Sequence, residues 1–394
     1  MRSVVAIPKI LLPARKDAES MRRWSVVACD QFTSDKKYWE EVAKAASGEP
    51  STLSLVFPEV YLKDGDKASR IERIGKKSAQ YLSDGTLQAL PAGFVLCERT
   101  TPFRKEKRFG VVLSVDLETY SFEPQSSFPV RATEETVPER LPARVEIRER
   151  AKIEAPHAML LYDAEEEDIL GFLRGERLEK LYDFDLMQGG GHLRGWFLPE
   201  DTAKEVAKRL YENAKENFLF AVGDGNHSLA AAKVCWEKIK KDLSDKERET
   251  HPARYALAEA VSIYSPALAF EPIHRFVSGV DAAKFLSGLP VAVERRGDGT
   301  VALAAESVPE ALRALDRYIA EYIGAEGGAV DYIHGDEALE SLVKGEERSV
   351  GILSKSIGKE GFFAEIEKNG SLPRKTFSMG EGAEKRYYTE CKEI

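Results

Sequence analysis

The stretch Phe218-Leu219-Phe220-Ala221-Val222-Gly223-Asp224-Gly225-Asn226-His227-Ser228 joins an apolar run to a glycine turn, and an alanine-rich run from Leu229 to Lys241 follows it. The apolar run predicts a buried strand, and the alanine-rich run predicts a helix. At such a junction the first N–H groups of the helix point at one spot, and the helix dipole favours an anion there. We therefore predict a strand–turn–helix unit with an anion-binding turn.

The same turn carries a carboxylate, an amide, an imidazole and a hydroxyl within six residues. Asp224 and His227 are therefore candidate catalytic residues, and Gly223, Gly225 and Asn226 are candidate ligand-binding residues. The alternative is an ordinary strand–helix turn, in which Asp224 or Ser228 serves as the N-cap.

Composition describes a soluble globular protein. The chain has 394 residues, 43% of them hydrophobic and 31% charged, which allows a large core and two subdomains. A net charge of −9 argues against a general nucleic-acid binder. No apolar run is long enough to span a bilayer, the first residues do not resemble a signal peptide, and the four cysteines are scattered. These features predict a cytoplasmic protein without a membrane partner.

The N-terminal half mixes strands and helices. Residues 67–82 fit an amphipathic helix, and the β-rich runs 93–99 and 108–117 predict a hairpin. A helix is expected over 165–180. The turn Gln188-Gly189-Gly190-Gly191-His192 favours a hairpin loop over a ligand-binding loop.

A segment rich in arginine and glutamate runs from Arg131 to Arg150. The plain interpretation is a helical, salt-bridged solvent face, but Pro138 and Pro142 would interrupt a single helix. Arginines on an irregular segment suit phosphate or carboxylate groups, because guanidinium forks match those anions bidentately. Arg131 is therefore a candidate ligand-binding residue, and Glu134 a candidate catalytic carboxylate.

Beyond residue 280 the pattern alternates between helix and strand. Helices are expected at 309–323, 337–344 and 359–368, and strands at 330–333 and 349–353, which follows βαβ logic. We predict a mixed α/β (α+β) fold, whose mixed sheet has N-terminal hairpins and a βαβ C-terminal part. The expected regions are 1–280, with the Gly223–Ser228 turn, and 281–394, packed into one composite unit.

Two further clusters bear cations. Pro272-Ile273-His274-Arg275 ends a predicted strand, and Pro373-Arg374-Lys375-Thr376 lies near the C-terminus. His274, Arg275, Lys375 and Thr376 are candidate ligand-binding residues, against the plain alternatives of a structural pair and a basic loop. The six histidines have no metal-ligand spacing, so no metal site is predicted. P-loop, dinucleotide-binding and GxSxG motifs are missing from the sequence.

The three motifs resemble, in order and rough spacing, the uncharacterised bacterial and archaeal family known as domain of unknown function 1015. Members carry a turn like D-G-H-H-R, then T-H-R, then M-P-x-K-S/T. The resemblance covers nearly the whole chain and implies no established reaction.

A weaker resemblance is to the ParB/sulfiredoxin superfamily, some of whose members phosphorylate free serine with a D-G-H-H-R turn. The resemblance implies a ParB/sulfiredoxin-like core and a nucleotide phosphate at the turn. This chain has Asn226 in place of the first histidine and Ser228 in place of the arginine. Another cation, such as Arg275 or Lys375, would have to replace the missing arginine.

The leading hypothesis is an enzyme acting on a phosphate-bearing or nucleotide ligand, as a small-molecule phosphotransferase. Phosphoryl transfer needs cations on the moving group and a base for the acceptor hydroxyl. Arg275 and Lys375 would supply the cations, Asp224 or Glu134 the base, and His227 would orient or shuttle a proton. Magnesium is expected if ATP or ADP is bound.

The alternatives are a non-catalytic nucleotide or small-acid binding protein and a ParB-like chromosome-associated protein. The acidic net charge and the missing helix-turn-helix pattern oppose the latter. The expected partner is a small, phosphate-bearing molecule, and a homo-oligomer is compatible with the sequence.

Overall fold

The computed structural model describes residues 3–297 and 299–394, and these residues form two compact units. Unit 1 comprises residues up to Leu268 together with Glu381–Ile394, and unit 2 comprises Ala269–Gly380. The predicted mixed α/β fold is confirmed in both units.

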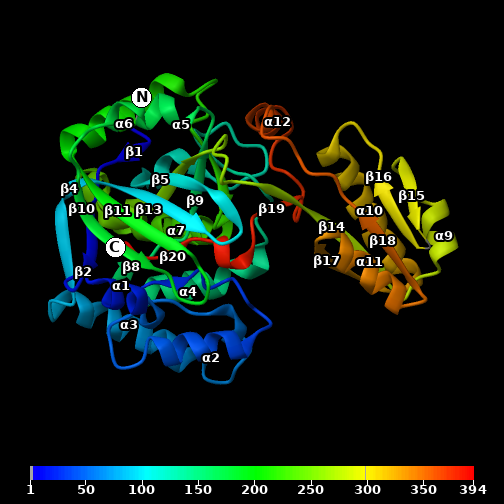
Figure 1. Ribbon diagram of the computed structural model, residues 1–394, viewed down its shortest axis with the longest axis horizontal. Coiled ribbons are helices and arrows are strands. Elements are labelled where there is room, and N and C mark those ends of the chain that lie inside the picture. Colours follow the sequence, from blue (N-terminus) through cyan, green and yellow to red (C-terminus); the bar gives the residue numbers. More distant parts are fainter. Residues whose placement is uncertain (1–2, 298) are drawn as a thin grey trace. The chain divides into compact units, whose positions relative to one another are not determined.

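The largest feature of unit 1 is a mixed sheet, which contains eleven strands in the described part of the chain (Figure 1). Nine of them follow the order β10-β11-β4-β5-β13-β9-β12-β7-β6, with β1 beside β5 and β2 beside β4. The bounds are β1 (Val5–Ala6), β2 (Lys9–Pro13), β4 (Leu87–Thr101), β5 (Arg104–Asp116), β6 (Tyr120–Ser121), β7 (Val130–Ala132), β9 (Met159–Tyr162), β10 (Glu179–Asp185), β11 (His192–Pro199), β12 (Phe220–Asp224) and β13 (Tyr255–Ser262). The pairs β12–β7, β13–β9 and β6–β7 are parallel, and the other pairs are antiparallel.

Helices cover both faces of this sheet. Figure 1 shows α5 and α6 on one side of the strands and α1 to α4 on the other. The bounds are α1 (Ala18–Trp24), α2 (Lys36–Ala45), α3 (Lys67–Ser83), α4 (Leu141–Arg150), α5 (Glu166–Leu170), α6 (Glu200–Asn213), α7 (Asn226–Ile239) and α8 (Asp245–Thr250). Strand residues alternate between two buried clusters, so Leu160 and Val222 belong to one core, whereas Val112 and Leu257 belong to the other.

The end of the chain returns to unit 1. There β20 (Tyr387–Tyr388) pairs with β3 (Val26–Val27), and β21 (Lys392–Glu393) pairs with β8 (Ile153–Glu154). The predicted division at residue 280 differs from the observed one for this reason. It differs also because β14 (Phe270–Ser278) pairs with strands of unit 2.

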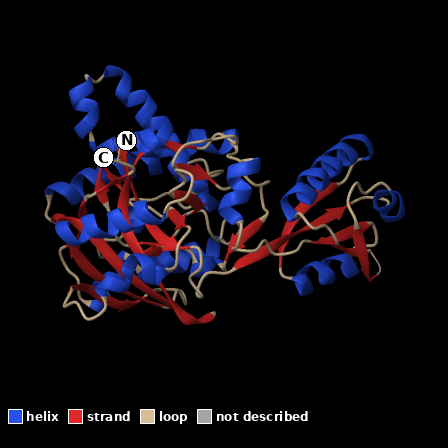
Figure 2. Ribbon diagram, turned by 90° about the horizontal axis from the view of Figure 1, so that it is seen from above, coloured by secondary structure: helices blue, strands red, loops and turns tan. Residues whose placement is uncertain are grey.

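Unit 2 has its own mixed sheet, with the order β15-β16-β18-β14-β17 and β19 beside β14. Leu312 and Leu315 of α10 pack on Val277 at one face, whereas Leu339 of α11 packs on Phe276 at the other. Figure 2 shows helices on both sides of these strands. The remaining bounds are α9 (Ala282–Ser287), β15 (Val293–Gly297), β16 (Thr300–Leu303), α10 (Val308–Glu326), β17 (Ala329–His334), α11 (Asp336–Gly345), β18 (Ser349–Leu353), α12 (Phe362–Asn369) and β19 (Phe377–Met379).

Two expectations about local structure are wrong. The helix predicted over 165–180 is shorter than expected. The helix α5 ends at Leu170, a 3-10 turn follows over Gly171–Leu173, and the chain then turns at Gly175, with a positive φ of 82°, before β10 begins at Glu179. The segment from Arg131 is less irregular than its prolines suggested. Pro142 occupies the first turn of α4, where its missing N–H costs no hydrogen bond.

The strand–turn–helix unit at 218–241 is observed as predicted. Gly225 is the N-cap of α7 with a left-handed φ of 75°, and neither Asp224 nor Ser228 takes that position. A Cβ atom at Gly225 would lie 2.8 Å from the Ala158 Cα atom. Both the backbone conformation and the close approach therefore require glycine here.

We expect Gly225→Ala to lower the free energy of unfolding of unit 1 by at least about 1–2 kcal/mol, the usual cost of left-handed backbone for a residue with a Cβ atom. All four tryptophans (Trp24, Trp39, Trp196 and Trp236) lie in unit 1, so urea unfolding followed by tryptophan fluorescence measures this unit. Gly65→Ala is the control, because Gly65 has an ordinary φ and open space around it. Equal effects of the two substitutions would contradict the assignment.

Candidate functional site

The candidate site lies at the edge of the unit 1 sheet where β12 ends and α7 begins. Val222 of β12 pairs with Ala132 of the parallel strand β7. Two residues further along the chain come Asp224, which ends β12, and Glu134, which lies in the loop just after β7, so this register brings the two predicted carboxylates to the same edge of the sheet. The Asp224 Oδ1 atom accepts a hydrogen bond from the Gly225 N–H at 2.9 Å.

Asn226 and His227 hold the loop that contains Glu134. The Asn226 side chain donates to the Val222 carbonyl at 3.1 Å and accepts from the Thr133 N–H at 3.3 Å. The His227 Nε2 atom accepts from the Val137 N–H at 3.1 Å. Both side chains thus tie the two chain segments together, and proton shuttling by His227 would require this bond to break.

Side chains on three neighbouring strands form a row that begins at Asp224 and runs across the sheet. Register places Asp224, Met159 and Glu259 side by side on β12, β9 and β13, and hence on one face of the sheet. Two consecutive residues of the C-terminal segment cover the row. The Lys385 Nζ atom lies 3.4 Å from Asp224 Oδ2, and Arg386 bonds Glu259 at 2.6 Å. Lys385 is therefore a cation beside the predicted catalytic carboxylate.

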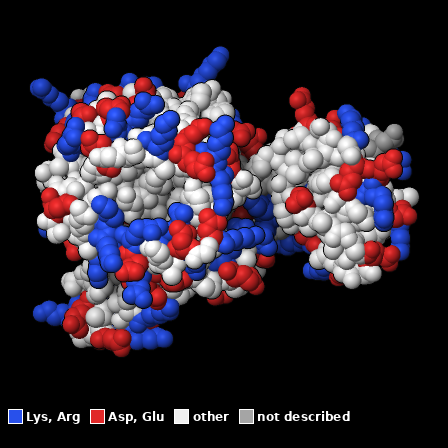
Figure 3. Space-filling view, turned by 90° about the horizontal axis from the view of Figure 1, so that it is seen from below, with Lys and Arg blue, Asp and Glu red and all other residues white. Residues whose placement is uncertain are grey.

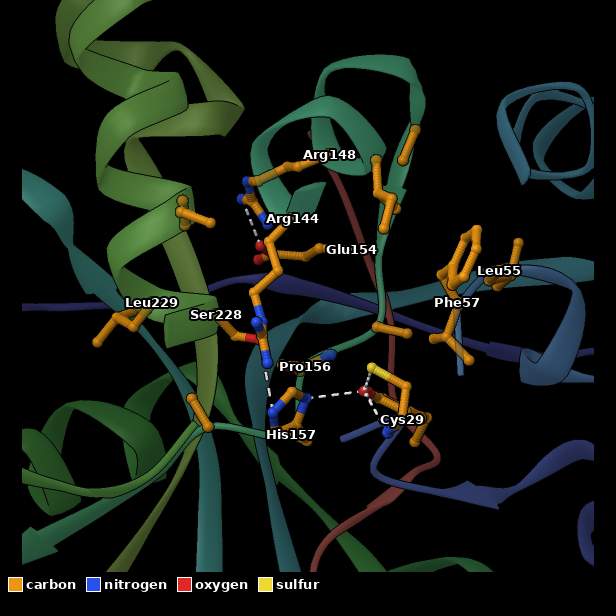
Figure 4. Close-up of a pocket in the computed structure, with 18 of the residues that line it drawn as sticks. Cys29, Leu55, Phe57, Arg144, Arg148, Glu154, Pro156, His157, Ser228 and Leu229 are labelled. Carbon is orange, nitrogen blue, oxygen red and sulfur yellow. Dashed lines mark hydrogen bonds and ion pairs between the residues drawn. The ribbon is translucent and has the colours of Figure 1, made fainter. Parts of the chain in front are cut away.

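His157 lies on the same face, two residues before Met159 in the chain, and it is only 3% exposed. Figure 4 shows its ring between Ser228 and the Cys29 region. The His157 Nδ1 atom is 2.7 Å from the Tyr388 hydroxyl, and Nε2 is 3.4 Å from both Ser228 Oγ and Asp30 Oδ2. The imidazole thus connects the start of α7 with an acidic residue of the N-terminal segment.

Burial and charge act in opposite directions on His157. Burial lowers the pKa of the ring, but the charge of Asp30 and its hydrogen bond outweigh burial, and Asp224 adds to them. The pKa of His157 is therefore raised above its ordinary value of 6.5. In contrast, burial raises the pKa of the Cys29 thiol to about 12, so this thiol stays protonated and is a poor nucleophile.

The raised pKa predicts how stability depends on pH. Protonated His157 stabilises unit 1 fully below about pH 6.5, and this contribution is lost as the pH rises through the higher folded pKa. We expect wild-type unit 1 to lose more stability than His157→Gln between about pH 6 and pH 8.5. Tryptophan-detected urea unfolding measures this difference. Asp30→Asn should also flatten the profile, and an equally steep profile in both variants would contradict the assignment.

A pocket with a volume of about 130 Å³ opens next to His157. Its walls come from the Leu55–Leu62 segment, α4, the loop before β9 and the first turns of α7. Two arginines of α4 reach it. Arg144 forms ion pairs with Glu59 and Asp30, and Arg148 pairs with Glu154 at 2.6 Å. The sequence suggested that arginines of this segment bind phosphate or carboxylate groups of a ligand. In the structure, Arg144 and Arg148 bind carboxylates of the protein itself.

Arg131 takes a different place. It is 4% exposed, its Nε donates to the Phe128 carbonyl at 2.7 Å, and its guanidinium lies 4.1 Å from the centre of the Phe218 ring. These contacts pack the start of β12 against the segment before β7.

His274, Arg275, Lys375 and Thr376 all belong to unit 2, where the second and third sequence motifs meet. Arg275 is fully buried and makes five hydrogen bonds, two to Asp316 and three to the carbonyls of Ile273, Arg374 and Lys375. A guanidinium has five N–H donors, so these bonds use all of them. Arg275 therefore anchors the Pro373–Thr376 turn and has no donor left for a phosphate.

The neighbours of Arg275 are similarly occupied. His274 lies 2.9 Å from Asp336 through Nε2, and its Nδ1 accepts from the Ser354 N–H at 3.1 Å. The Thr376 hydroxyl donates to the Pro373 carbonyl at 2.6 Å. Lys375 is partly exposed and has a positive φ of 58°, which is uncommon for a residue other than glycine. Of the four, Lys375 has the most accessible side chain.

Three side chains of the site were not anticipated from the sequence: His157, Lys385 and Tyr388. No local motif marks them, since His157 follows Ala155-Pro156 and the other two lie in the C-terminal segment. Only strand pairing brings them to the β12 edge. A pairing signal between Tyr387-Tyr388 and Val26-Val27 would have been needed to find them.

The described residues contain no group of three or more His, Cys, Asp or Glu side chains suited to a metal ion. Over residues 3–297 and 299–394, no helix is both long enough and apolar enough to cross a bilayer. Lysine and arginine are interspersed with aspartate and glutamate on the face that Figure 3 shows.

Similar solved structures include a free serine kinase in complex with AMP, with 12% identity and a TM-score of 0.40, covering 72% of this chain and 91% of that chain. A conserved hypothetical protein from Pyrococcus furiosus has 12% identity and a TM-score of 0.38, covering 72% and 94%. SbnI from Staphylococcus aureus, truncated at its C-terminus, has 11% identity and a TM-score of 0.35, covering 68% and 82%.

No curated protein matches the chain. A family model, described as "Protein of unknown function (DUF1015)", matches residues 11–381. Since this match spans nearly the whole sequence, the protein belongs to the DUF1015 family.

Proposed function

We propose that the protein is an enzyme that transfers a phosphoryl group to a small molecule, with its reacting groups at the β12–α7 edge of unit 1. One observation carries the proposal. The carboxylate of Asp224 stands before the N-terminus of a 14-residue helix, 3.4 Å from the ammonium of Lys385 and close enough to His157 to raise its pKa. Phosphoryl transfer uses a base for the acceptor hydroxyl and cations on the moving group, and a helix N-terminus can bind a phosphate.

The roles follow from chemistry and position. Asp224 takes the proton of the acceptor hydroxyl while the oxygen of that hydroxyl forms a bond to phosphorus. At the same time the bond between phosphorus and the oxygen of the leaving phosphate breaks. Lys385 and the first N–H groups of α7 offset the charge of the phosphate. Lys385 replaces Arg275 in this role, because every donor of Arg275 is engaged within unit 2.

Glu134 and Lys375 keep secondary roles in the proposal. If the phosphate donor is ATP or ADP, Glu134 at the same edge fits the Mg²⁺ that such donors bring, since Mg²⁺ typically binds one or two carboxylates plus phosphate oxygens. Lys375 remains a ligand-binding candidate of unit 2. The Pro373–Thr376 turn that carries it is held rigidly by Arg275, which suits a binding group.

Turnover assays test the proposal. The full-length protein is incubated with ATP or ADP, with and without Mg²⁺, and with pooled amino acids and alcohols, and phosphorylated products are detected by mass spectrometry. A phosphorylated acceptor that requires the protein supports phosphoryl transfer. Nucleotide binding without any product would instead favour a non-catalytic nucleotide-binding protein, and the absence of both would contradict the proposal.

A further inference from the structure

The pocket beside His157 has a mostly apolar wall. Leu55, Phe57, Ile147, Leu229 and Ala231 contribute to it from three separate segments of unit 1 (Figure 4). Its volume of about 130 Å³ is close to that of an engineered apolar cavity, about 150 Å³, that stays dry and binds benzene. The space therefore matches one six-membered ring or a branched chain of similar size.

The charged side chains on the wall are already paired. Arg144 is engaged by Glu59 and Asp30, and the Glu154 carboxylate bonds both Arg148 and the Leu257 N–H, the latter at 2.7 Å. A ligand with its own charge would have to break one of these pairs, which is costly at a buried site. The wall thus favours a neutral ligand over an anion or a cation.

One corner of the pocket offers hydrogen bonds without a net charge. Tyr388 donates its hydroxyl proton to Cys29 Sγ at 3.1 Å and lies 2.7 Å from His157 Nδ1. The Nε2 atom of His157 donates a hydrogen bond when the ring is protonated, and it accepts one when the ring is neutral with its proton on Nδ1. A hydroxyl group suits either state, because it can both accept and donate. The neighbours of Nε2, Ser228 Oγ and Asp30 Oδ2, both lie at 3.4 Å, which is long for a hydrogen bond. A ligand hydroxyl between Nε2 and Ser228 Oγ would make better contacts.

We propose that this pocket binds a neutral molecule with an apolar body about the size of a benzene ring and a single hydroxyl group, which contacts His157 and Ser228. That such an alcohol or phenol is the phosphoryl acceptor rests on the proposed function, because Ser228 lies in the first turn of α7, four residues after Asp224. The binding itself does not depend on that function. It follows from the shape and polarity of the pocket.

Binding of phenol, benzene and benzoate to the full-length protein tests the proposal. Isothermal titration should show saturable binding of phenol, roughly fivefold tighter than that of benzene because of one net hydrogen bond, and much weaker binding of benzoate. Ser228→Ala should reduce the advantage of phenol over benzene. Ala231→Leu should weaken both ligands by about tenfold or more, because the added atoms occupy the pocket.

Ala45→Leu is the control, because Ala45 lines a different hollow of unit 1. Tryptophan-detected unfolding shows whether each variant is folded, and Ser228→Ala supplies a second readout if Ala231→Leu is not. Absence of saturable phenol binding, equal binding of phenol and benzene, or unchanged binding in folded Ala231→Leu would each overturn the inference. If the protein binds phenol but neither binds ATP or ADP nor forms a phosphorylated product, the proposed function is refuted and this inference stands. Nucleotide turnover without phenol binding would refute only this inference.

Discussion

Replacing Asp224 with Asn should reduce phosphoryl transfer by about 10²–10⁴-fold, the usual contribution of a positioned general base. Asn keeps the size of the side chain, and its amide oxygen can still accept the hydrogen bond from the Gly225 N–H. Only the base and its negative charge are lost. We therefore expect the substitution to lower kcat strongly. Stability should also fall, because the mostly buried Lys385 loses its ion-pair partner, but the protein should remain folded.

Turnover and urea unfolding of the same preparations separate the two possible roles of Asp224. Asp66→Asn is the matched control, because Asp66 is also ion-paired, to Arg70 at 2.9 Å, but lies at the start of α3. It should leave turnover unchanged. Full turnover by Asp224→Asn together with a clearly lowered stability would show that Asp224 serves the fold and not the reaction.

The second large effect concerns the buried charges beneath the site. Arg386 is 4% exposed and bonds the carboxylates of Glu259 and Glu390, each at 2.6 Å, and the Pro156 carbonyl at 3.2 Å. Arg386→Met leaves two buried carboxylates without their shared cation. We expect unit 1 to lose about 3–5 kcal/mol of its free energy of unfolding, the typical result of removing one partner from a buried ion pair.

Arg174→Met is the comparison for this substitution. Arg174 pairs with Glu167 at 2.5 Å, but both side chains are largely exposed, so the expected loss is below about 1 kcal/mol. Tryptophan fluorescence during urea unfolding measures both variants. Equal losses would mean that Arg386 does not hold the C-terminal segment against the sheet of unit 1. Because Lys385 precedes Arg386 in this segment, such a result would contradict the position of Lys385 beside Asp224.

Local sequence patterns predicted the elements whose structure depends only on residues close together in the chain. The apolar run 218–222, the turn at Gly223–Ser228 and the amphipathic helix at 67–82 all have strong periodicity or turn chemistry, and all are observed. For these elements local sequence was sufficient, because each depends on residues close together in the chain. The catalytic roles of Asp224 and Glu134 stay predictions, and the two carboxylates reach one edge of the sheet only because the distant strands β12 and β7 pair in parallel.

Features that depend on distant pairing were not predictable in this way. His157 and Tyr388 are 231 positions apart, and they meet only because β20 pairs with β3 near the N-terminus. Arg275 illustrates the opposite error. Its sequence context suggested a phosphate ligand, but its donors bond carbonyls of the second and third motifs themselves and the carboxylate of Asp316, which lies outside both motifs. A cationic motif can serve either role, and burial decides between them.

The central claim is that Lys385 and Asp224 form a phosphate-handling site at the start of α7. Isothermal titration of ADP, with and without Mg²⁺, against wild-type protein and Lys385→Met tests it most directly. The account predicts saturable binding to the wild type that Lys385→Met weakens by about 10–100-fold, as expected for a hydrogen bond to a charged group. Lys76→Met, which removes an exposed lysine paired with Glu72, should bind like the wild type. No ADP binding, or equal binding by Lys385→Met and wild type, would contradict the account.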